Sequence, residues 1–142
     1  MIVETILSQK GGDVACIAAD ASVADAVCML CEKRIGALVV TRGDEAVAGV
    51  FSERDLVRGI NDFGGGVLQK RVADLMTADV QTVTRRDKVD HLMSLMTDRR
   101  IRHLPVVENG KLLGLVSIGD VVKNKIAETE QEAEALRNYI AS

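Results

Sequence analysis

The chain has 142 residues, of which 47% are hydrophobic, 27% charged and only 2% aromatic. A chain of this length buries enough surface to fold without disulfides or metals. The scarcity of aromatic rings argues against a stacking surface for single-stranded nucleic acid, and the net charge of −3 argues against binding to a duplex. We therefore expect no nucleic-acid partner.

The first 62 residues predict a strand, a helix, two strands and a second helix. Ser22 is placed to cap the first helix, with Asp25 three residues on, and the apolar side chains after it recur at helical spacing. The two later apolar runs are nearly continuous, which is typical of strands covered on both faces. The expected elements are a strand near 15–18, a helix after Ser22 with the stripe Val23, Ala26, Val27 and Leu30, strands at 37–41 and 47–51, and a helix from Ser52 to about Asn61.

The middle of the chain predicts a linker followed by a short helix. Residues 62–70 contain three consecutive glycines, which favour a flexible linker. We expect the segment Val72 to Met76 to be a short helix leading into the second half of the chain. Its counterpart before the first half is Val3 to Leu7.

The second half repeats this order of elements. Its helix carries the stripe Val89, Leu92, Met93 and Met96, and Asn109-Gly110 predicts a hairpin between apolar runs at 104–107 and 112–116. A long helix is expected after Ser117, to about Tyr139, and it is long enough to extend beyond the body. It has an acidic flank and an apolar stripe, so it is either a solvated helix or a contact for a partner.

The two halves are copies of one unit. Gly49-Val-Phe-Ser52-Glu-Arg-Asp55 returns 65 residues later as Gly114-Leu-Val-Ser117-Ile-Gly-Asp120, and residues 14–41 overlie 80–107 with a shift of 66. We therefore divide the chain into a first unit at 1–62, a linker at 63–70, a second unit at 71–125 and a C-terminal helical extension at 126–142.

The duplicated Ser-x-x-Asp motif has two interpretations. In the structural one, each serine and aspartate caps the helix that follows. In the functional one, the helix N-terminus and the serine hydroxyl hold a phosphate, while the aspartate accepts hydrogen bonds from the two hydroxyls of a ribose. Gly49 and Gly114 would allow close approach of a backbone.

The order of these motifs resembles the cystathionine β-synthase (CBS) domain, which is found as tandem pairs called Bateman modules. The resemblance covers the chain to about Lys125 and indicates a stand-alone CBS pair. The motifs that carry it are Asp74-Leu-Met-Thr77, Arg34-Ile-Gly-Ala-Leu-Val-Val40, Arg100-Ile-Arg-His-Leu-Pro-Val106 and both Gly-x-x-Ser-x-x-Asp segments.

The resemblance implies a mixed α/β fold in which two βαββα repeats pack about a pseudo-two-fold axis, followed by a long C-terminal helix. Two clefts between the repeats would bind adenosine-containing ligands. Asp55 and Asp120 would bind ribose, Ser52 and Ser117 phosphate, and the segments 14–17 and 80–83 would line the adenine slots. The remaining nucleotide-binding residues that it implies are Arg54, Gly36, Ala37, Leu38, Thr82, Arg102, His103, Leu104, Pro105 and Ile118.

The two clefts are expected to differ. Arg54 has Gly119 as its counterpart, so Arg54 favours phosphate binding in the first cleft. Arg102 and His103 favour the second cleft for a ligand with two or more phosphates. The ligands that the resemblance implies are AMP, ADP, ATP, NAD(H) and S-adenosylmethionine.

The expected function is regulatory. The resemblance implies a nucleotide sensor that signals in trans to an unknown regulated protein, forms a homodimer, and needs no catalytic residue, metal or catalytic cofactor. The N-terminus lacks the pattern of a signal peptide, and no apolar run is long enough to span a membrane, so we expect a cytoplasmic protein with no membrane partner. The alternatives are a small redox or nucleotide-hydrolysing enzyme and a structural dimeric adaptor without a ligand.

The remaining candidates for chemistry have structural interpretations. Cys28 and Cys31 have redox spacing, but they lie inside a predicted helix beside core positions, so we expect buried, inert thiols. Cys16 is expected to pack in a strand. His91 falls on the polar side of a predicted helix and is expected to be solvated.

Overall fold

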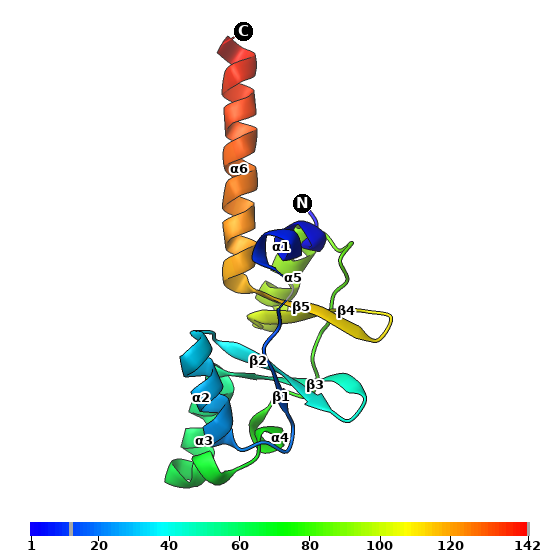
Figure 1. Cartoon of the computed structure of the whole chain (residues 1–142). Coiled ribbons are helices and arrows are strands. Elements are labelled where there is room, and N and C mark those ends of the chain that lie inside the picture. The colour runs from blue at the N-terminus through cyan, green and yellow to red at the C-terminus, as the bar shows by residue number, and fades with distance from the viewer. Residues whose placement is uncertain (12, 142) are drawn as a thin grey trace.

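The elements of the chain form two units, stacked one above the other in Figure 1, and a helix that extends away from them. The structure is a computed structural model and describes residues 1–11 and 13–141. The elements are α1 (Val3–Lys10), β1 (Cys16–Ala18), α2 (Val23–Lys33), β2 (Ala37–Arg42), β3 (Glu45–Ser52), α3 (Glu53–Phe63), the 3-10 helix η1 (Gly64–Gln69), α4 (Val72–Leu75), α5 (Val89–Arg99), β4 (His103–Glu108), β5 (Lys111–Ser117) and α6 (Ile118–Ala141).

Each unit contains a small sheet. In the first, β1 pairs in parallel with β2, and β2 pairs antiparallel with β3. In the second, β4 and β5 form an antiparallel hairpin. The repeat predicts a further strand before α5, but only Val83 pairs there, through a parallel bridge to Val106. The preceding residues line a cavity instead of extending the ladder.

The helices α2 and α5 form for the reasons that the repeat predicts. The amide of Asp25 donates to the Ser22 hydroxyl at 3.1 Å, which caps α2. Both helices end at an arginine in the left-handed conformation, with φ of 53° at Arg34 and at Arg100. Most of each expected stripe is buried, and Val27 and Met93 are partly buried beside it; the buried members are Val23, Ala26, Leu30, Val89, Leu92 and Met96.

The short helices that lead into each unit are exchanged between the cores. Val3 and Ile6 of α1 are buried in the core of the second unit, and Val72 of α4 is buried in the core of the first. Backbone hydrogen bonds fix both helices: the Val3 amide donates to the Asp87 carbonyl, and the Val72 amide to the Ala21 carbonyl. The exchange ties the two units together through the chain itself.

The segment predicted to be a flexible linker is ordered. Its glycines begin the 3-10 helix η1, and Val67 of this helix is buried in the core of the first unit. Gly59 of α3 permits the close packing, because a Cβ atom there would lie 2.9 Å from Cγ2 of Val67. A single buried valine therefore anchors a stretch whose composition favours flexibility.

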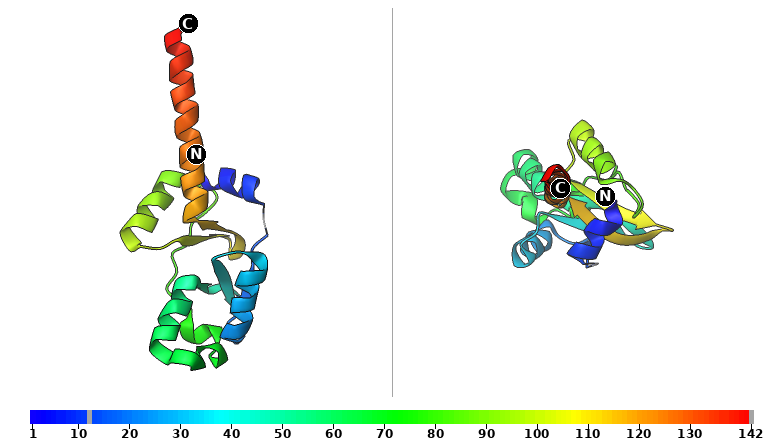
Figure 2. Two further views of the ribbon diagram at one scale, coloured as in Figure 1. Left: turned by 90° about the vertical axis from the view of Figure 1, so that its left-hand side faces the viewer. Right: turned by 90° about the horizontal axis from the view of Figure 1, so that it is seen from above.

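The last helix, α6, leaves the body of the protein. Its first turns pack against the second unit, where Val121 and Asn124 are buried. Every residue from Thr129 to Ala141 is exposed, and the left view in Figure 2 shows the helix continuing away from the two units. The expected end near Tyr139 lies two residues from the observed one.

Candidate functional site

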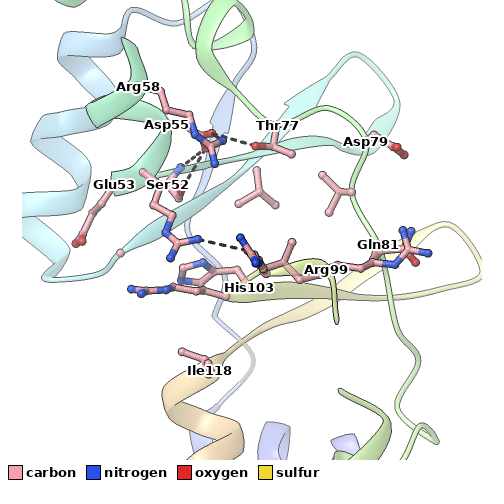
Figure 3. Close-up of a pocket in the computed structure, with 17 residues that line it drawn as sticks. Ser52, Glu53, Asp55, Arg58, Thr77, Asp79, Gln81, Arg99, His103 and Ile118 are labelled. Carbon is pink, nitrogen blue, oxygen red and sulfur yellow. Dashed lines mark hydrogen bonds and ion pairs between the residues drawn. The ribbon is translucent and has the colours of Figure 1, made fainter. Parts of the chain in front are cut away.

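A cavity of about 530 Å³ lies between the two units. Its walls come from the junction of β3 and α3, from the segment after α4, and from the corner between α5 and β4 (Figure 3). We call it the first cavity. It is lined by Gly36, Val50, Ser52, Glu53, Arg54, Asp55, Arg58, Thr77, Asp79, Val80, Gln81, Arg99, Arg100, Ile101, Arg102, His103 and Ile118.

The first cavity is rich in guanidinium groups. Five arginines line it, two from α3 and three from the end of α5 and the residues after it, against three carboxylates. Guanidinium groups bind phosphate oxygens through paired, charge-assisted hydrogen bonds. The charge of the walls therefore suits an anionic ligand with at least one phosphate. The arginines are Arg54, Arg58, Arg99, Arg100 and Arg102.

Asp55 lies in the first turn of α3, and both oxygens of its carboxylate accept hydrogen bonds from residues of the chain. One oxygen accepts from the Ser52 amide at 2.8 Å and from the Ser52 hydroxyl at 3.1 Å. The other accepts from the Thr77 hydroxyl at 3.0 Å, and Nη1 of Arg58 lies 3.9 Å away. The residue is only 4% exposed. The motif therefore caps α3 in this structure, as its structural interpretation predicts, and presents the Thr77-bound carboxylate oxygen to the cavity.

Gly49 allows the backbone of Thr77, from the same chain, to pack closely against β3. Its neighbour Val50 exchanges two backbone hydrogen bonds with Thr77, of 3.0 and 2.9 Å. A Cβ atom on Gly49 would lie 2.6 Å from the Thr77 carbonyl oxygen. In the second unit a Cβ on Gly114 would meet the Leu7 side chain. These glycines thus seat the lead-in segments that bring Thr77 and Lys10 to the two aspartates.

Arg54, Arg102 and His103 all line the first cavity. The expectation that Arg54 serves the first cleft and that Arg102 and His103 serve the second was wrong, because each cleft lies between the units and takes walls from both. Nη1 of Arg54 donates to the Arg100 carbonyl oxygen at 3.3 Å, across the cavity. The left-handed backbone of Arg100 turns the chain there, at the end of α5.

A second cavity, of about 730 Å³, lies in the pseudo-symmetric position. Its basic groups are Lys10, Lys33 and Arg34, with Asp13 as the carboxylate. Ser117 lies in its wall, as Ser52 does in the first. The full lining is Lys10, Asp13, Val14, Ala15, Lys33, Arg34, Ile35, Gly36, Ala37, His103, Leu115 and Ser117.

Asp120 is held by Lys10 beside this cavity. The Lys10 ammonium lies 2.7 Å from Oδ2 of Asp120 and also donates to the Leu115 carbonyl at 2.6 Å. The Ser117 amide donates to the same Asp120 oxygen at 2.9 Å. Burial alone would raise the pKa of Asp120, but the hydrogen bonds from Lys10 and Ser117 hold this pKa below its usual value.

His103 lies in the walls of both cavities. Burial lowers its pKa, and the positive charges of Lys10 and Arg102 lower it further against the opposing effect of Glu53 and Asp120. The imidazole is therefore neutral at pH 7. A neutral imidazole still offers one N–H donor to a phosphate or hydroxyl that enters either cavity.

The structure brings most, but not all, of the expected site residues to the cavities. Ser52, Arg54, Asp55, Arg102 and Ile118 line the first, Ala37 and Ser117 the second, and Gly36 and His103 both. Of the expected adenine slots, Val80 and Gln81 line the first cavity, and Val14 and Ala15 line the second.

Five expected residues line neither cavity. Leu38 of β2 and Leu104 of β4 are fully buried core residues, and Pro105 is buried beside Leu104. Thr82 is exposed. Asp120 does not line the second cavity itself but bonds to Lys10 and Ser117, which do. Leu38, Leu104 and Pro105 therefore support the site as packing, since a side chain facing the core does not reach the cavity.

Several lining residues were missed by the sequence reasoning. Lys10 and Thr77 lie in the lead-in segments at the start of their units, and only the exchange of lead-in helices places them beside the aspartates of the other unit. Arg58 lies one turn beyond Asp55 on α3, so its spacing from the motif was a usable signal. Arg99 and Arg100 end α5 next to the Arg102 that was identified.

The three cysteines are all exposed. The prediction that Cys28 and Cys31 are buried was wrong, because α2 buries the face defined by Val23, Ala26 and Leu30, and both thiols lie on the other side. Cys16 lies at an outward position of β1. His91 is exposed, as expected.

Residues 1–11 and 13–141, which the structure describes, contain no group of three or more histidine, cysteine, aspartate or glutamate side chains placed to hold a metal ion. No helix among them is both long enough and apolar enough to cross a bilayer.

Comparison with known proteins assigns the fold and the family. The family model for the CBS domain matches twice, at residues 3–62 and 72–126. A mitochondrial CBS domain-containing protein of Arabidopsis thaliana is 42% identical over 125 residues, which cover 85% of this chain and 61% of that protein's length. The chain thus spans about three fifths of this relative.

Solved structures agree with the family match. A CBS-domain containing protein from Agrobacterium tumefaciens is 43% identical and superposes with a TM-score of 0.85, covering 88% of this chain and 99% of the other. A CBS domain protein from Pyrobaculum aerophilum complexed with AMP is 26% identical, with a TM-score of 0.75, and the match covers 84% and 89% of the two chains. The chain belongs to the CBS domain family and carries two CBS domains in tandem.

Proposed function

We propose that this protein is a regulatory module that binds an adenosine-containing nucleotide in the first cavity and signals to another protein. The observation that carries the proposal is the meeting of five arginines with the Ser52–Asp55 motif in one cavity between the units. The complex of AMP with the Pyrobaculum aerophilum relative supports the ligand class. The cavity volume, about 530 Å³, falls in the range of small-molecule sites.

The ribose would bind at Asp55. Its Oδ1 atom accepts a hydrogen bond from the Thr77 hydroxyl, and Nη1 of Arg58 lies 3.9 Å away, beyond hydrogen-bond distance, so this oxygen can accept further hydrogen bonds from a ligand. Two ribose hydroxyls would donate to this carboxylate, while the bonds from Ser52 continue to cap α3 and hold the carboxylate in place. Nucleotide binding would therefore loosen the contact between Asp55 and the segment after α4.

The phosphates would lie between the N-terminus of α3 and the residues that follow α5. Arg54, Arg100 and Arg102 offer guanidinium groups there, and the first turn of α3 offers backbone N–H groups. Val50, Val80 and Ile118 provide apolar surface for the adenine ring. Because Arg54 bonds to the Arg100 carbonyl across the cavity, a phosphate that draws Arg54 away would change the link between the units.

The second cavity would be the weaker nucleotide site. Lys10 is bonded to Asp120, so a ribose there must displace a charged partner rather than a threonine hydroxyl. Lys33 and Arg34 still give this cavity positive charge. Among the candidate ligands, the arginines of the first cavity favour those with phosphate, AMP, ADP, ATP and NAD(H), over S-adenosylmethionine.

The output would be a change in affinity for a regulated partner, with the protein acting as a homodimer in the cytoplasm and without a reaction of its own. The exchanged lead-in helices support such a mechanism, because α1 and α4 join each cavity to the core of the opposite unit. A shift of Thr77 on ligand binding would therefore move α4, which packs in the core of the first unit. A shift of Lys10 would move α1, which packs in the core of the second.

A thermal-shift panel of adenosine ligands tests the proposal. A ligand present at a hundred times its dissociation constant adds about 2.7 kcal/mol of apparent stability. The variant Asp55→Ala removes charged hydrogen bonds worth roughly 1.5–3 kcal/mol each, so its ligand-induced shift should fall sharply. Asp120→Ala should leave most of the shift intact if the first cavity is the main site.

Asp74→Ala is the matched control for the loss of a capping carboxylate. Asp74 accepts from the Arg71 amide at 3.0 Å at the start of α4 and lines neither cavity. The Asp74→Ala variant should have a lower melting temperature without ligand than the wild type, but the same ligand-induced shift. If the double variant Asp55→Ala with Asp120→Ala is shifted as much as the wild type by every ligand, the proposed sites are wrong.

A further inference from the structure

One face of α6 carries a seven-residue repeat of apolar and small side chains. The spacing alternates between four and three residues, which is the a and d pattern of a coiled coil. We call this face the α6 stripe. Its members are Val122, Ile126, Thr129, Ala133, Leu136 and Ile140, with Ile126, Ala133 and Ile140 at the a positions.

The α6 stripe is exposed along its whole length. Ile126 is 54% exposed, Leu136 59% and Ile140 74%. The side of α6 that packs on the body is a different one, marked by the buried residues Val121 and Asn124. Figures 1 and 2 show the distal half of α6 standing clear of both units. Large aliphatic side chains on a free helix are stabilised when a second helix covers them.

The charges beside the stripe indicate which helix covers it. With Ile126 at an a position, Lys125 and Glu132 occupy g positions, and Glu130 and Arg137 occupy e positions. In a parallel pair of helices each g residue faces the e residue five positions later on the other helix. Two copies of α6 then place Lys125 opposite Glu130 of the partner subunit, and Glu132 opposite Arg137 of the partner subunit.

The parallel arrangement pairs opposite charges while every a and d residue faces its own copy. In an antiparallel arrangement, e positions face e positions and g positions face g positions, and a residues face d residues instead. Leu136 then lies far from its own copy, so the trapping experiment below separates the two arrangements. Arg137 is available for the pair with Glu132 of the partner subunit, since its contact within the chain is from Nε to the Ala133 carbonyl at 3.4 Å. Lys125 also has an exposed ion pair with Asp90 at 3.1 Å.

We propose that α6 forms a parallel, in-register coiled coil with α6 of a second copy of this chain, through the α6 stripe. This interface is separate from both cavities and does not require a nucleotide. It would fix two nucleotide-binding bodies at one end of a shared stalk.

Disulfide trapping tests the register. In a parallel coiled coil the d residue Leu136 meets its own copy, so a cysteine there forms a disulfide between subunits. The variant Leu136→Cys would be made in a chain whose exposed Cys16, Cys28 and Cys31 are serine. Asn138→Cys, at the outward f position of the same turn, is the control. Under mild oxidation at micromolar protein, non-reducing electrophoresis should show Leu136→Cys forming dimers about tenfold faster, because the two thiols share a high effective concentration.

Charge exchange tests the pairing. Glu132→Arg places arginine opposite Arg137 of the partner subunit, and Arg137→Glu places glutamate opposite the partner's Glu132. Each variant alone should raise the dimer dissociation constant in analytical ultracentrifugation by about tenfold. An equal mixture of the two should recover wild-type affinity, because the mixed dimer restores both attractive pairs.

Circular dichroism and the melting temperature of the body confirm that each variant is folded. Equal trapping rates for Leu136→Cys and Asn138→Cys would overturn the proposal, as would a mixture that associates no better than either charge variant alone. A dimer held by another surface, or an α6 that binds a different protein, gives these same negative results.

Discussion

Nη1 of Arg54 donates a hydrogen bond of 3.3 Å to the carbonyl oxygen of Arg100, from the first turn of α3 in one unit to the end of α5 in the other. The bond crosses the first cavity at the place where the arginines gather. Arg54 has no charged counterpart in the second unit, where Gly119 stands. The first cavity therefore has a guanidinium group, that of Arg54, at a position where the second unit has only the glycine Gly119.

Arg54→Ala should weaken binding of phosphate-bearing nucleotides more than binding of adenosine. Loss of a charged hydrogen bond to phosphate costs about 1.5–3 kcal/mol, which is roughly a ten- to hundredfold increase in the dissociation constant. Isothermal titration with AMP, ATP and adenosine measures the difference. Arg86→Ala, an exposed arginine that lines neither cavity, is the control and should leave all three affinities unchanged. Equal losses for adenosine and ATP would exclude a phosphate contact for Arg54.

Gly49→Ala should destabilise the fold. The new Cβ would lie 2.6 Å from the Thr77 carbonyl oxygen, and this backbone atom is held by its own hydrogen bond to Val50. Overpacking of this kind costs about 1–3 kcal/mol of unfolding free energy. Gly65→Ala, where a Cβ would have nothing within 4 Å, is the matched control. Urea unfolding of both variants should separate them, and equal stabilities would show that the lead-in segment moves freely away from β3.

Lys10→Met should lower stability at neutral pH but not in acid. The Asp120 pKa is held below its usual value in the folded protein, so this carboxylate contributes stability above its unfolded pKa of about 3.9 and loses it as the pH falls through its folded pKa. Because the pair with Lys10 is partly exposed, we expect a difference of about 0.5–1 kcal/mol. Urea unfolding from pH 7 to pH 2.5 should show the difference shrink as the pH falls below about 4.

Lys111→Met is the control for loss of a lysine, since Lys111 lies exposed at the turn between β4 and β5. Its effect should be small at every pH. A Lys10→Met effect that is as large at pH 2.5 as at pH 7 would mean that lost packing, rather than the ion pair, is responsible.

All three thiols should react with iodoacetamide in the native protein. Cys28 and Cys31 lie on the outward side of α2, and Cys16 is also exposed. Burial around the Cys16 sulfur raises its pKa, so this residue should react more slowly than the other two. Peptide mass spectrometry over time gives the three rates. Protection of Cys28 and Cys31 would show that α2 is covered in solution, and rates far above those of a free thiol would favour the redox alternative.

Much of the fold was predictable because the two units repeat. The pairing of Ser52 with Asp55 and of Ser117 with Asp120 marks the start of each helix, and Asn109-Gly110 marks the second hairpin. These signals are local, so they can be recognised in the sequence without knowledge of tertiary contacts. The predicted order of α2, β2, β3 and α3 was confirmed for the same reason.

The remainder depended on contacts between distant segments. No local signal shows that α1 packs in the second core, so Lys10 and Thr77 were not assigned to the aspartates that they contact. Arg54 and Arg102 line the same cavity because of the way the units face each other, which one unit's sequence does not specify. Cys28 and Cys31 were wrongly predicted to be buried because each is next to a residue of the apolar stripe in the sequence. The helix turns about 100° per residue, so the neighbour of a buried residue can face solvent.

A titration of the ¹⁵N-labelled protein with AMP and with ATP, followed by amide chemical shifts, tests the central claim most directly. The proposed site predicts that the largest changes fall on Ser52 to Asp55, on Thr77 and on Arg99 to His103, with smaller changes around Lys10 and Ser117. Saturable shifts confined to other surfaces, or no shifts at millimolar nucleotide, would contradict nucleotide binding between the two units.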